Sequence, residues 1–108
     1  MNEKKKILVE AKSILSDPQH WTKGSWARDR SGNICNEKSP DAFCFCLFGA
    51  VTRAGYNLNL YGYRGYVRDT FENAVGQQFI TFNDNPDTTF EMIHEALDKA
   101  IAACGDEA

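Results

Sequence analysis

Cys46 is the side chain in this sequence best suited to covalent chemistry. A thiol near the start of a helix can have a lowered pKa and act as a nucleophile when a base takes its proton. His94 is the base that the sequence offers, and Asn83 or Asp84 would orient its imidazole as in papain-like sites. The helix expected over 40–54 places the thiol about two turns from the helix start, where the dipole is weak. A buried structural thiol is therefore the favoured interpretation.

Residues 56–66 are the best candidate for ligand binding. The segment is rich in tyrosine, asparagine and glycine, and it contains Tyr61, Tyr63 and Arg64. Tyrosine rings stack on bases or sugars, and arginine takes phosphate or carboxylate groups in a bidentate manner. A small anionic aromatic ligand would suit this segment. An interface rich in tyrosine and arginine, with a second copy or another protein, is equally typical of such a surface, and a solvated loop is a third interpretation.

Four side chains outside this segment complete the candidate ligand contacts, namely Trp26, Arg28, Asn83 and Asp84. Arg28 could grip an anionic group or could pair with Asp29 or Asp84. Asn83 and Asp84 could bind a cation or a ligand hydroxyl. Asparagine and aspartate also bond to nearby backbone amides at turns and helix starts. We favour that structural role for the pair.

The composition excludes some classes of partner. The 108-residue chain has 12 Lys and Arg against 15 Asp and Glu, which gives a net charge of −3. No basic excess is present to meet the phosphates of a polynucleotide, and no apolar run approaches the roughly 20 residues that span a bilayer. The basic N-terminus is followed by an amphipathic pattern rather than by the apolar core of a signal peptide. We expect a cytoplasmic protein with no polynucleotide and no membrane among its partners.

The cysteines do not form a metal-binding pattern. No Cys-x-x-Cys pair occurs, and neither histidine has zinc-like spacing with a cysteine. In a reducing cytoplasm, four free and mostly buried thiols are expected. The four residues are Cys35, Cys44, Cys46 and Cys104. We expect no metal and no cofactor.

The length predicts a single domain over 1–108, with its core over about 5–104. Apolar periodicity and capping residues predict a mainly α fold (α+β) with about four helices, over about residues 3–15, 40–54, 67–75 and 88–104. A small β-hairpin is expected within 21–36, around a turn at 30–33, and should pack over the second and last helices. Residues 77–82 are expected to be extended and 83–86 to form a turn.

The helix expected over 40–54 has the clearest start. Ser39 can cap it, Pro40 suits its first position, and Gly55 suits its end. Gly49 lies inside this helix, where glycine costs about 1 kcal/mol relative to alanine. A close neighbour, either backbone or ligand, would explain a glycine at this position.

Three short motifs carry a resemblance to a domain of unknown function. They read Trp21-Thr-Lys-Gly-Ser-Trp-Ala-Arg-Asp-Arg-Ser-Gly32, Phe45-Cys-Leu-Phe-Gly-Ala50 and Phe82-Asn-Asp-Asn-Pro86. The chain resembles, over about residues 5–102, a family that occurs in bacterial proteins, many of them actinobacterial, and in bacteriophage proteins. The matching positions are Trp21, Gly24, Ala27, Arg28, Asp29, Gly32, Cys46, Leu47, Gly49, Ala50, Asn83, Asp84 and Pro86. Phe45 and Phe82 stand where the family often has tryptophan, which keeps the aromatic bulk.

The resemblance implies a fold type and a site but brings no established activity. The leading hypothesis is a small non-enzymatic binding module for an anionic aromatic or nucleotide-like ligand, with the contacts Trp26, Arg28, Tyr61, Tyr63, Arg64, Asn83 and Asp84. In a phage setting it would act in the host cytoplasm and sequester a nucleotide-derived signal of a defence system. The alternatives are a thiol-dependent hydrolase using Cys46, His94 and Asp84, and a protein–protein interaction module, including a homo-oligomer.

Overall fold

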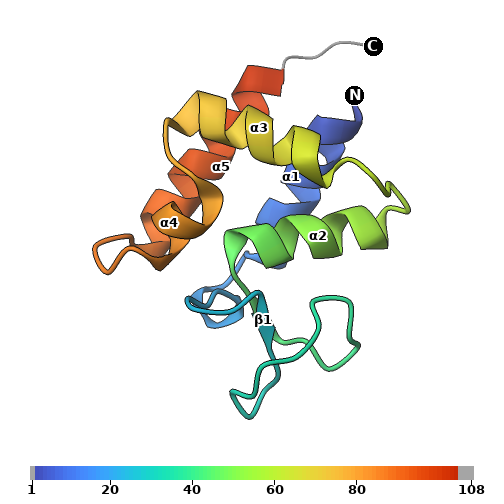
Figure 1. Ribbon diagram of the computed structural model, residues 1–108, viewed down its shortest axis with the longest axis vertical. Coiled ribbons are helices and arrows are strands. Elements are labelled where there is room, and N and C mark those ends of the chain that lie inside the picture. Colours follow the sequence, from blue (N-terminus) through green and yellow to red (C-terminus); the bar gives the residue numbers. More distant parts are fainter. Residues whose placement is uncertain (1, 105–108) are drawn as a thin grey trace.

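The structure, a computed structural model, describes residues 2–104 and is mainly helical (Figure 1). In chain order its elements are α1 (Glu3–Ile14), a 3₁₀ turn (Pro18–His20), β1 (Ala27–Arg28), β2 (Cys44–Phe45), α2 (Leu47–Asn57), α3 (Arg64–Val75), α4 (Phe79–Asp84) and α5 (Phe90–Cys104). The mainly α fold that the sequence predicts is confirmed, and its strands form one antiparallel pair. No helix in the described residues is long and apolar enough to cross a membrane.

The core lies where α1, α2, α3 and α5 meet (Figure 1). Each of these helices turns an apolar stripe inward, and its fully buried side chains include Leu8, Leu47, Phe71 and Leu97. Burying one such side chain contributes about 1.5–3 kcal/mol to stability. The two ends of the described chain meet, because the Asn2 side chain donates to the Cys104 carbonyl oxygen (3.0 Å). The strands and the long loops lie to one side of this helical core.

Helix α2 spans Leu47–Asn57, so the expectation of a helix over 40–54 is wrong for its first half and also at its end, because Gly55 lies inside the helix. Ser39 does act as a cap, but it caps an isolated turn, where its Oγ accepts a hydrogen bond from the Asp41 amide (3.1 Å). The chain then runs extended because β2 pairs with β1. Cys46 consequently becomes the N-cap of α2.

β1 lies in the expected hairpin within 21–36, but the strand that it pairs with is β2 rather than the segment after the turn at 30–33. β1 pairs with β2, with Arg28 opposite Cys44. The segment after that turn meets β1 on its other side, through a bridge between Arg28 and Ile34. The Asp29 amide also donates to the Asn33 carbonyl oxygen (2.9 Å) and the Cys35 amide to the Ala27 carbonyl oxygen (3.1 Å), so the expected hairpin forms in part. The turn over 30–33 does form, and the Asp29 side chain accepts hydrogen bonds from two of its amides. β2 leads directly into the buried start of α2, so its pairing with β1 fixes where that helix begins.

The expectation of an extended segment over 77–82 is also wrong, because most of it lies in α4. Gly76 ends α3 in the left-handed conformation (φ 80°). The carboxylate of Glu72 then accepts a hydrogen bond from the Phe79 amide (3.0 Å). This amide is the first of α4 and has no acceptor within the helix itself. The expected turn over 83–86 is displaced along the chain, since its first two residues end this helix.

Candidate functional site

Asn83 joins the three sequence motifs. Its side chain is 0% exposed, and its Oδ1 accepts hydrogen bonds from Trp21 Nε1 (2.7 Å) and the Leu47 amide (3.1 Å). Its Nδ2 donates to the Thr22 carbonyl oxygen (3.0 Å) and to Asp84 Oδ1 (3.0 Å). A primary amide has two donors and two acceptor lone pairs, so this capacity is fully used. Asn83 is therefore a structural cross-link between α4, α2 and the segment before β1, and it has no group left for a ligand.

Asp84 lies next to this cross-link but remains exposed. Its Oδ1 also accepts a hydrogen bond from the Gly24 amide (3.0 Å), which fixes the turn at residue 24. Its Oδ2 has no donor among the described residues. The carboxylate thus combines a structural role with one free oxygen at the surface.

The Cys46 thiol is buried at the start of α2. Its Sγ accepts a hydrogen bond from the Gly49 amide (3.3 Å), as an N-cap side chain does. Burial raises the pKa of the Cys46 thiol, and the nearby Asp84 carboxylate raises it further, against the lowering effect of the Gly49 and Phe48 amides. The thiol is therefore held in its neutral, poorly nucleophilic form.

His94 is engaged elsewhere in the fold. Its Nε2 donates to the Leu15 carbonyl oxygen at the end of α1 (2.6 Å), and its ring packs on Phe90 with ring centroids 4.6 Å apart. No hydrogen bond joins His94 to Cys46 among the described residues. The imidazole and the thiol thus each have a structural partner of their own.

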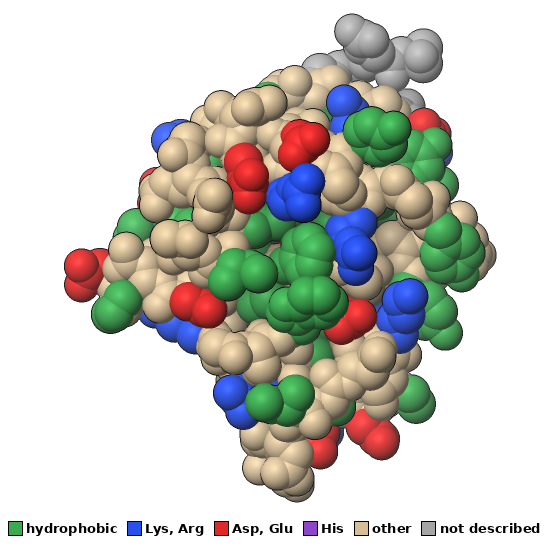
Figure 2. Space-filling model, in the orientation of Figure 1, with side chains coloured by type: hydrophobic (Ala, Val, Ile, Leu, Met, Phe, Trp, Pro, Cys, Tyr) green, Lys and Arg blue, Asp and Glu red, His purple; other side chains and the backbone are tan. Residues whose placement is uncertain are grey.

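Trp26 is 41% exposed and stands beside α2. Its ring meets Phe48 edge-on with centroids 4.9 Å apart, and the guanidinium of Arg64 lies over the same Phe48 ring (5.0 Å). Figure 2 shows one face of the molecule, on which hydrophobic side chains gather near the centre with Lys and Arg side chains beside them. Two predicted ligand contacts, Trp26 and Arg64, therefore share one aromatic neighbour.

Arg28 closes the turn that follows β1. Its guanidinium donates to the Gly32 carbonyl oxygen (3.0 Å). No ion pair joins Arg28 to Asp29 or Asp84 among the described residues. Arg28 thus has a local structural partner within its own loop.

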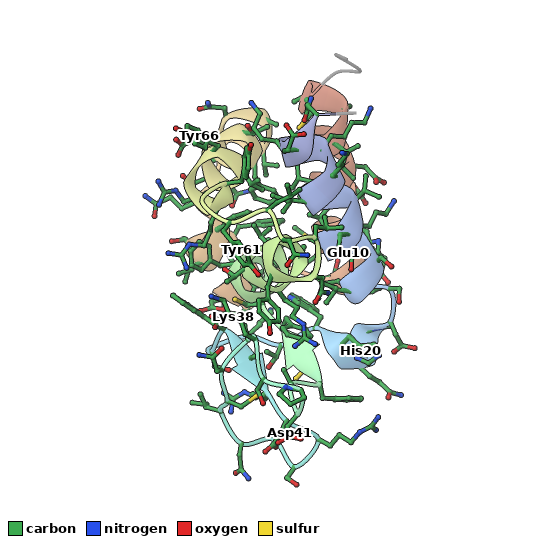
Figure 3. All side chains as sticks on the ribbon, turned by 90° about the vertical axis from the view of Figure 1, so that its right-hand side faces the viewer. Glu10, His20, Lys38, Asp41, Tyr61 and Tyr66 are labelled. Carbon is green, nitrogen blue, oxygen red and sulfur yellow. The ribbon has the colours of Figure 1, made fainter. Side chains whose placement is uncertain are left out.

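A pocket of about 330 Å³ opens between the end of α2, the loop after it and the start of α3. We call it the tyrosine pocket. Its polar and aromatic lining consists of Tyr56, Tyr61, Arg64, Lys38 and Thr52. Figure 3 looks onto this face, where Tyr61 and Lys38 lie one above the other beside α2. The structure therefore brings two predicted contacts, Tyr61 and Arg64, into one concave site.

The tyrosine pocket is electropositive. The ammonium group of Lys38 and the guanidinium of Arg64 have no hydrogen-bond acceptor or carboxylate partner among the described residues, although each lies near an aromatic ring. Within residues 2–104, no acidic side chain lines the pocket. Tyr63 provides no side-chain cap for the first amides of α3, which begins at the edge of the pocket. Helix N-termini with free amides attract anions.

Lys38 reaches the tyrosine pocket because Arg53 holds its loop. The Arg53 guanidinium donates to the carbonyl oxygens of Glu37 (3.1 Å) and Ser39 (2.8 Å), and its Nε donates to Asn57 Oδ1 (3.1 Å). This clamp fixes residues 37–39 against α2. Sequence reasoning missed Lys38, because only the tertiary fold brings that loop next to α2.

Tyr63 lies outside the tyrosine pocket. It packs near Tyr66, with ring centroids 6.5 Å apart, and both rings line a separate hollow beside residues 2–4 at the start of the chain. The tyrosine-rich segment therefore divides between two sides of α3. Among residues 2–104 no cluster of His, Cys, Asp and Glu is arranged to hold a metal ion, and all four cysteines are free thiols.

The fold and the motifs define a small helical domain in which several motif residues, such as Asn83 and Cys46, hold neighbouring segments together through hydrogen bonds. The chain belongs to a family of unknown function, DUF6197, whose family model matches residues 1–103. A search of curated proteins and a search of solved structures each found no match.

Proposed function

We propose that this chain is a non-enzymatic binding module that holds a small anionic aromatic ligand in the tyrosine pocket. The observation that carries the proposal is the pair of cations, Lys38 and Arg64, which line an aromatic pocket and have no acidic partner among the described residues. The chain as a whole is acidic, so a local site with only positive charge is not a consequence of composition. Such a site favours a phosphate or carboxylate group.

The size and lining of the pocket fit a small ligand. A volume of about 330 Å³ lies at the lower end of the range, roughly 300–1,000 Å³, that is typical of small-molecule sites. Tyr56 and Tyr61 present aromatic rings, and a planar ligand ring can stack on them. Gly62 and Gly65 leave backbone accessible at the rim. A ligand whose ring stacks on the two tyrosines and whose anionic group lies at the start of α3 would contact both the aromatic and the cationic side chains of the pocket.

Nucleotide-like ligands combine these two chemical parts. In a phage-infected cell, a module of this kind would sequester a nucleotide-derived signal of a host defence system in the cytoplasm. We do not propose a thiol hydrolase, since the pKa of the Cys46 thiol is raised and the Nε2 of His94 is bonded to Leu15.

The experiment is calorimetric titration of the purified protein with AMP, ADP-ribose and cyclic di-AMP as probes. Arg64→Gln and Lys38→Gln should each weaken binding about tenfold or more, because each removes one charge-assisted contact to the anion. Arg68→Gln is the matched control, since Arg68 is an arginine on the same helix that pairs with Asp69 (3.4 Å) outside the pocket. This variant should bind as the parent does.

Native mass spectrometry of the protein purified gently from its own cells identifies the physiological ligand. A discrete non-covalent mass addition that Arg64→Gln abolishes is the expected result. A clean apo spectrum together with no saturable binding of the three probes would reject the proposal. Equal losses in Arg64→Gln and Arg68→Gln would remove the tyrosine pocket from consideration.

A further inference from the structure

A second, smaller hollow lies between the segment just before β1, the start of α2 and α4. Its volume is about 90 Å³. Its lining consists of Gly24, Ser25, Trp26, Cys46, Ile80 and Asp84, none of which lines the tyrosine pocket. We call it the Trp26 hollow. It has room for one side chain and is too small for a drug-sized ligand.

Two side chains that line the Trp26 hollow, those of Trp26 and Ile80, are apolar and exposed. Trp26 is 41% exposed and Ile80 48% exposed. The Trp26 ring does not swing freely, because it packs edge-on against Phe48 (4.9 Å between centroids). Its backbone is fixed as well, since its carbonyl oxygen accepts a hydrogen bond from the Cys46 amide (3.2 Å). A ready-made aromatic wall of this kind lowers the entropy cost of binding.

The polar side of the Trp26 hollow carries one negative charge. Asp84 is held in place through Oδ1 by the Gly24 amide and the Asn83 side chain, while Oδ2 has no donor. No cation of the described residues forms an ion pair with Asp84. Cys46 adds no charge to the hollow, because burial raises the pKa of its thiol and keeps it neutral. The carboxylate is thus positioned but not neutralised.

Ser25 adds a polar atom that lacks a partner. Its Oγ is buried and forms no hydrogen bond among the described residues. Buried hydroxyl groups in folded proteins are nearly always hydrogen-bonded, so an orphaned one calls for an explanation. Ser25 lines the hollow beside Asp84, and a donor that enters the hollow would supply the missing bond after rotation of the serine side chain.

We propose that the Trp26 hollow receives the cationic side chain, lysine or arginine, of a partner protein. The cation pairs with the free oxygen of Asp84, and its aliphatic stem packs between Trp26 and Ile80. The charge of the lining favours a cationic partner, because Asp84 is the one charged side chain among the described residues that line the hollow. An exposed tryptophan next to a fixed carboxylate also has the anatomy of an interface hot spot, and a cation near the indole face gains a cation–π interaction.

The test is a titration of ¹⁵N-labelled protein followed through its tryptophan indole N–H signals by NMR. The chain has two tryptophans, and Trp26→Phe identifies the Trp26 signal. The probes are the blocked tripeptides acetyl-Gly-Lys-Gly-amide and acetyl-Gly-Arg-Gly-amide. At least one should shift the Trp26 signal saturably and leave the Trp21 signal, whose Nε1 is bonded to buried Asn83, unchanged. Acetyl-Gly-norleucine-Gly-amide, which keeps the stem without the charge, should bind more weakly.

Asp84→Asn separates charge from structure, since its amide oxygen can still accept from the Gly24 amide. It should weaken the cationic probe roughly fivefold, the scale of a solvent-exposed ion pair. Glu95→Gln on α5, a similar loss of one exposed carboxylate, should change nothing. An unshifted Trp21 signal in Asp84→Asn shows that the cross-link survives. The proposal is overturned if no cationic probe moves the Trp26 signal, if norleucine binds equally well, or if Asp84→Asn binds as tightly as the parent.

Discussion

Gly49 lies directly against the backbone of Trp26. A Cβ at position 49 would stand 1.9 Å from the Trp26 carbonyl oxygen and 2.8 Å from its carbonyl carbon. The same oxygen accepts the hydrogen bond from the Cys46 amide (3.2 Å), so the first turn of α2 rests on the residue just before β1. This contact between a helix and a neighbouring backbone sets the position of the exposed Trp26 ring.

Gly49→Ala should destabilise the protein by about 3 kcal/mol or more, because a backbone oxygen cannot move aside as a side-chain tip can. The measurement is urea unfolding followed by tryptophan fluorescence. Gly65→Ala is the matched control: this glycine also lies in a helix, and its added Cβ would meet nothing within 4 Å. The control should be neutral or up to about 1 kcal/mol more stable, as helix propensity dictates. Similar stabilities for the two variants would contradict the contact.

The sequence predicts that Gly49 has a close neighbour, but it does not identify that neighbour as the Trp26 backbone. Glycine inside a helix is costly, so Gly49 alone indicates a close neighbour, and the neighbour is backbone rather than ligand. The ranges of α1 and α5 also follow from local periodicity to within two residues, whereas α3 begins at Arg64, before the expected start at 67. The start of α2 does not follow in this way, since Ser39 and Pro40 form a good helix start by local rules. The pairing of β1 with β2 overrides those rules, and such pairing is invisible to local signals.

Only part of the candidate site can be predicted from the sequence, because local patterns do not show which distant segments meet. Tyr61 and Arg64 share the tyrosine pocket because they are close in sequence and the loop between α2 and α3 is short. Lys38 is missed because a clamp by Arg53 brings its loop to α2. Asn83 is expected at a turn, where asparagine is common, but its four bonds are formed with residues mostly distant in the chain. Tertiary hydrogen bonds of this kind have no local sequence signature.

Asn83→Ala should cost about 3 kcal/mol or more, since it leaves the Trp21 indole, the Leu47 amide and a carbonyl oxygen without partners in a buried region. Thermal unfolding and the chemical shift of the Trp21 indole N–H give the two readouts. Asn57→Ala removes an exposed asparagine with two side-chain hydrogen bonds and should stay within about 1 kcal/mol of the parent. An unchanged indole shift in Asn83→Ala would show that the cross-link is absent in solution.

Cys46→Ser and Cys46→Ala should differ in stability because position 46 caps α2. Serine retains an acceptor for the Gly49 amide, whereas alanine loses the bond that Sγ makes (3.3 Å). We expect the alanine variant to be less stable than the serine variant by about 1 kcal/mol. Urea unfolding under reducing conditions measures the difference. Equal stabilities would mean that the thiol fills space without capping the helix.

The buried Cys46 thiol should also make stability depend on pH in the alkaline range. Burial raises the pKa of this thiol in the folded protein, so the folded state holds the proton more tightly than the unfolded chain does. The contribution is fully present below the unfolded pKa, about 8.5, and is lost as pH rises through the folded pKa. The parent should therefore lose more stability than Cys46→Ser between about pH 7 and about pH 9.5. Parallel losses in the two proteins would contradict the shift.

Arg53→Gln should weaken ligand binding although Arg53 does not line the tyrosine pocket. The substitution removes the donors that hold the loop of Lys38, so the lysine loses its fixed place beside Tyr56. We expect AMP affinity to fall about three- to tenfold and stability to fall by about 1–2 kcal/mol. Calorimetry on Arg53→Gln, Lys38→Gln and the double variant gives a double-mutant cycle. If Arg53 acts through Lys38, the double variant should bind no more weakly than Lys38→Gln alone. Additive losses would assign Arg53 a separate role.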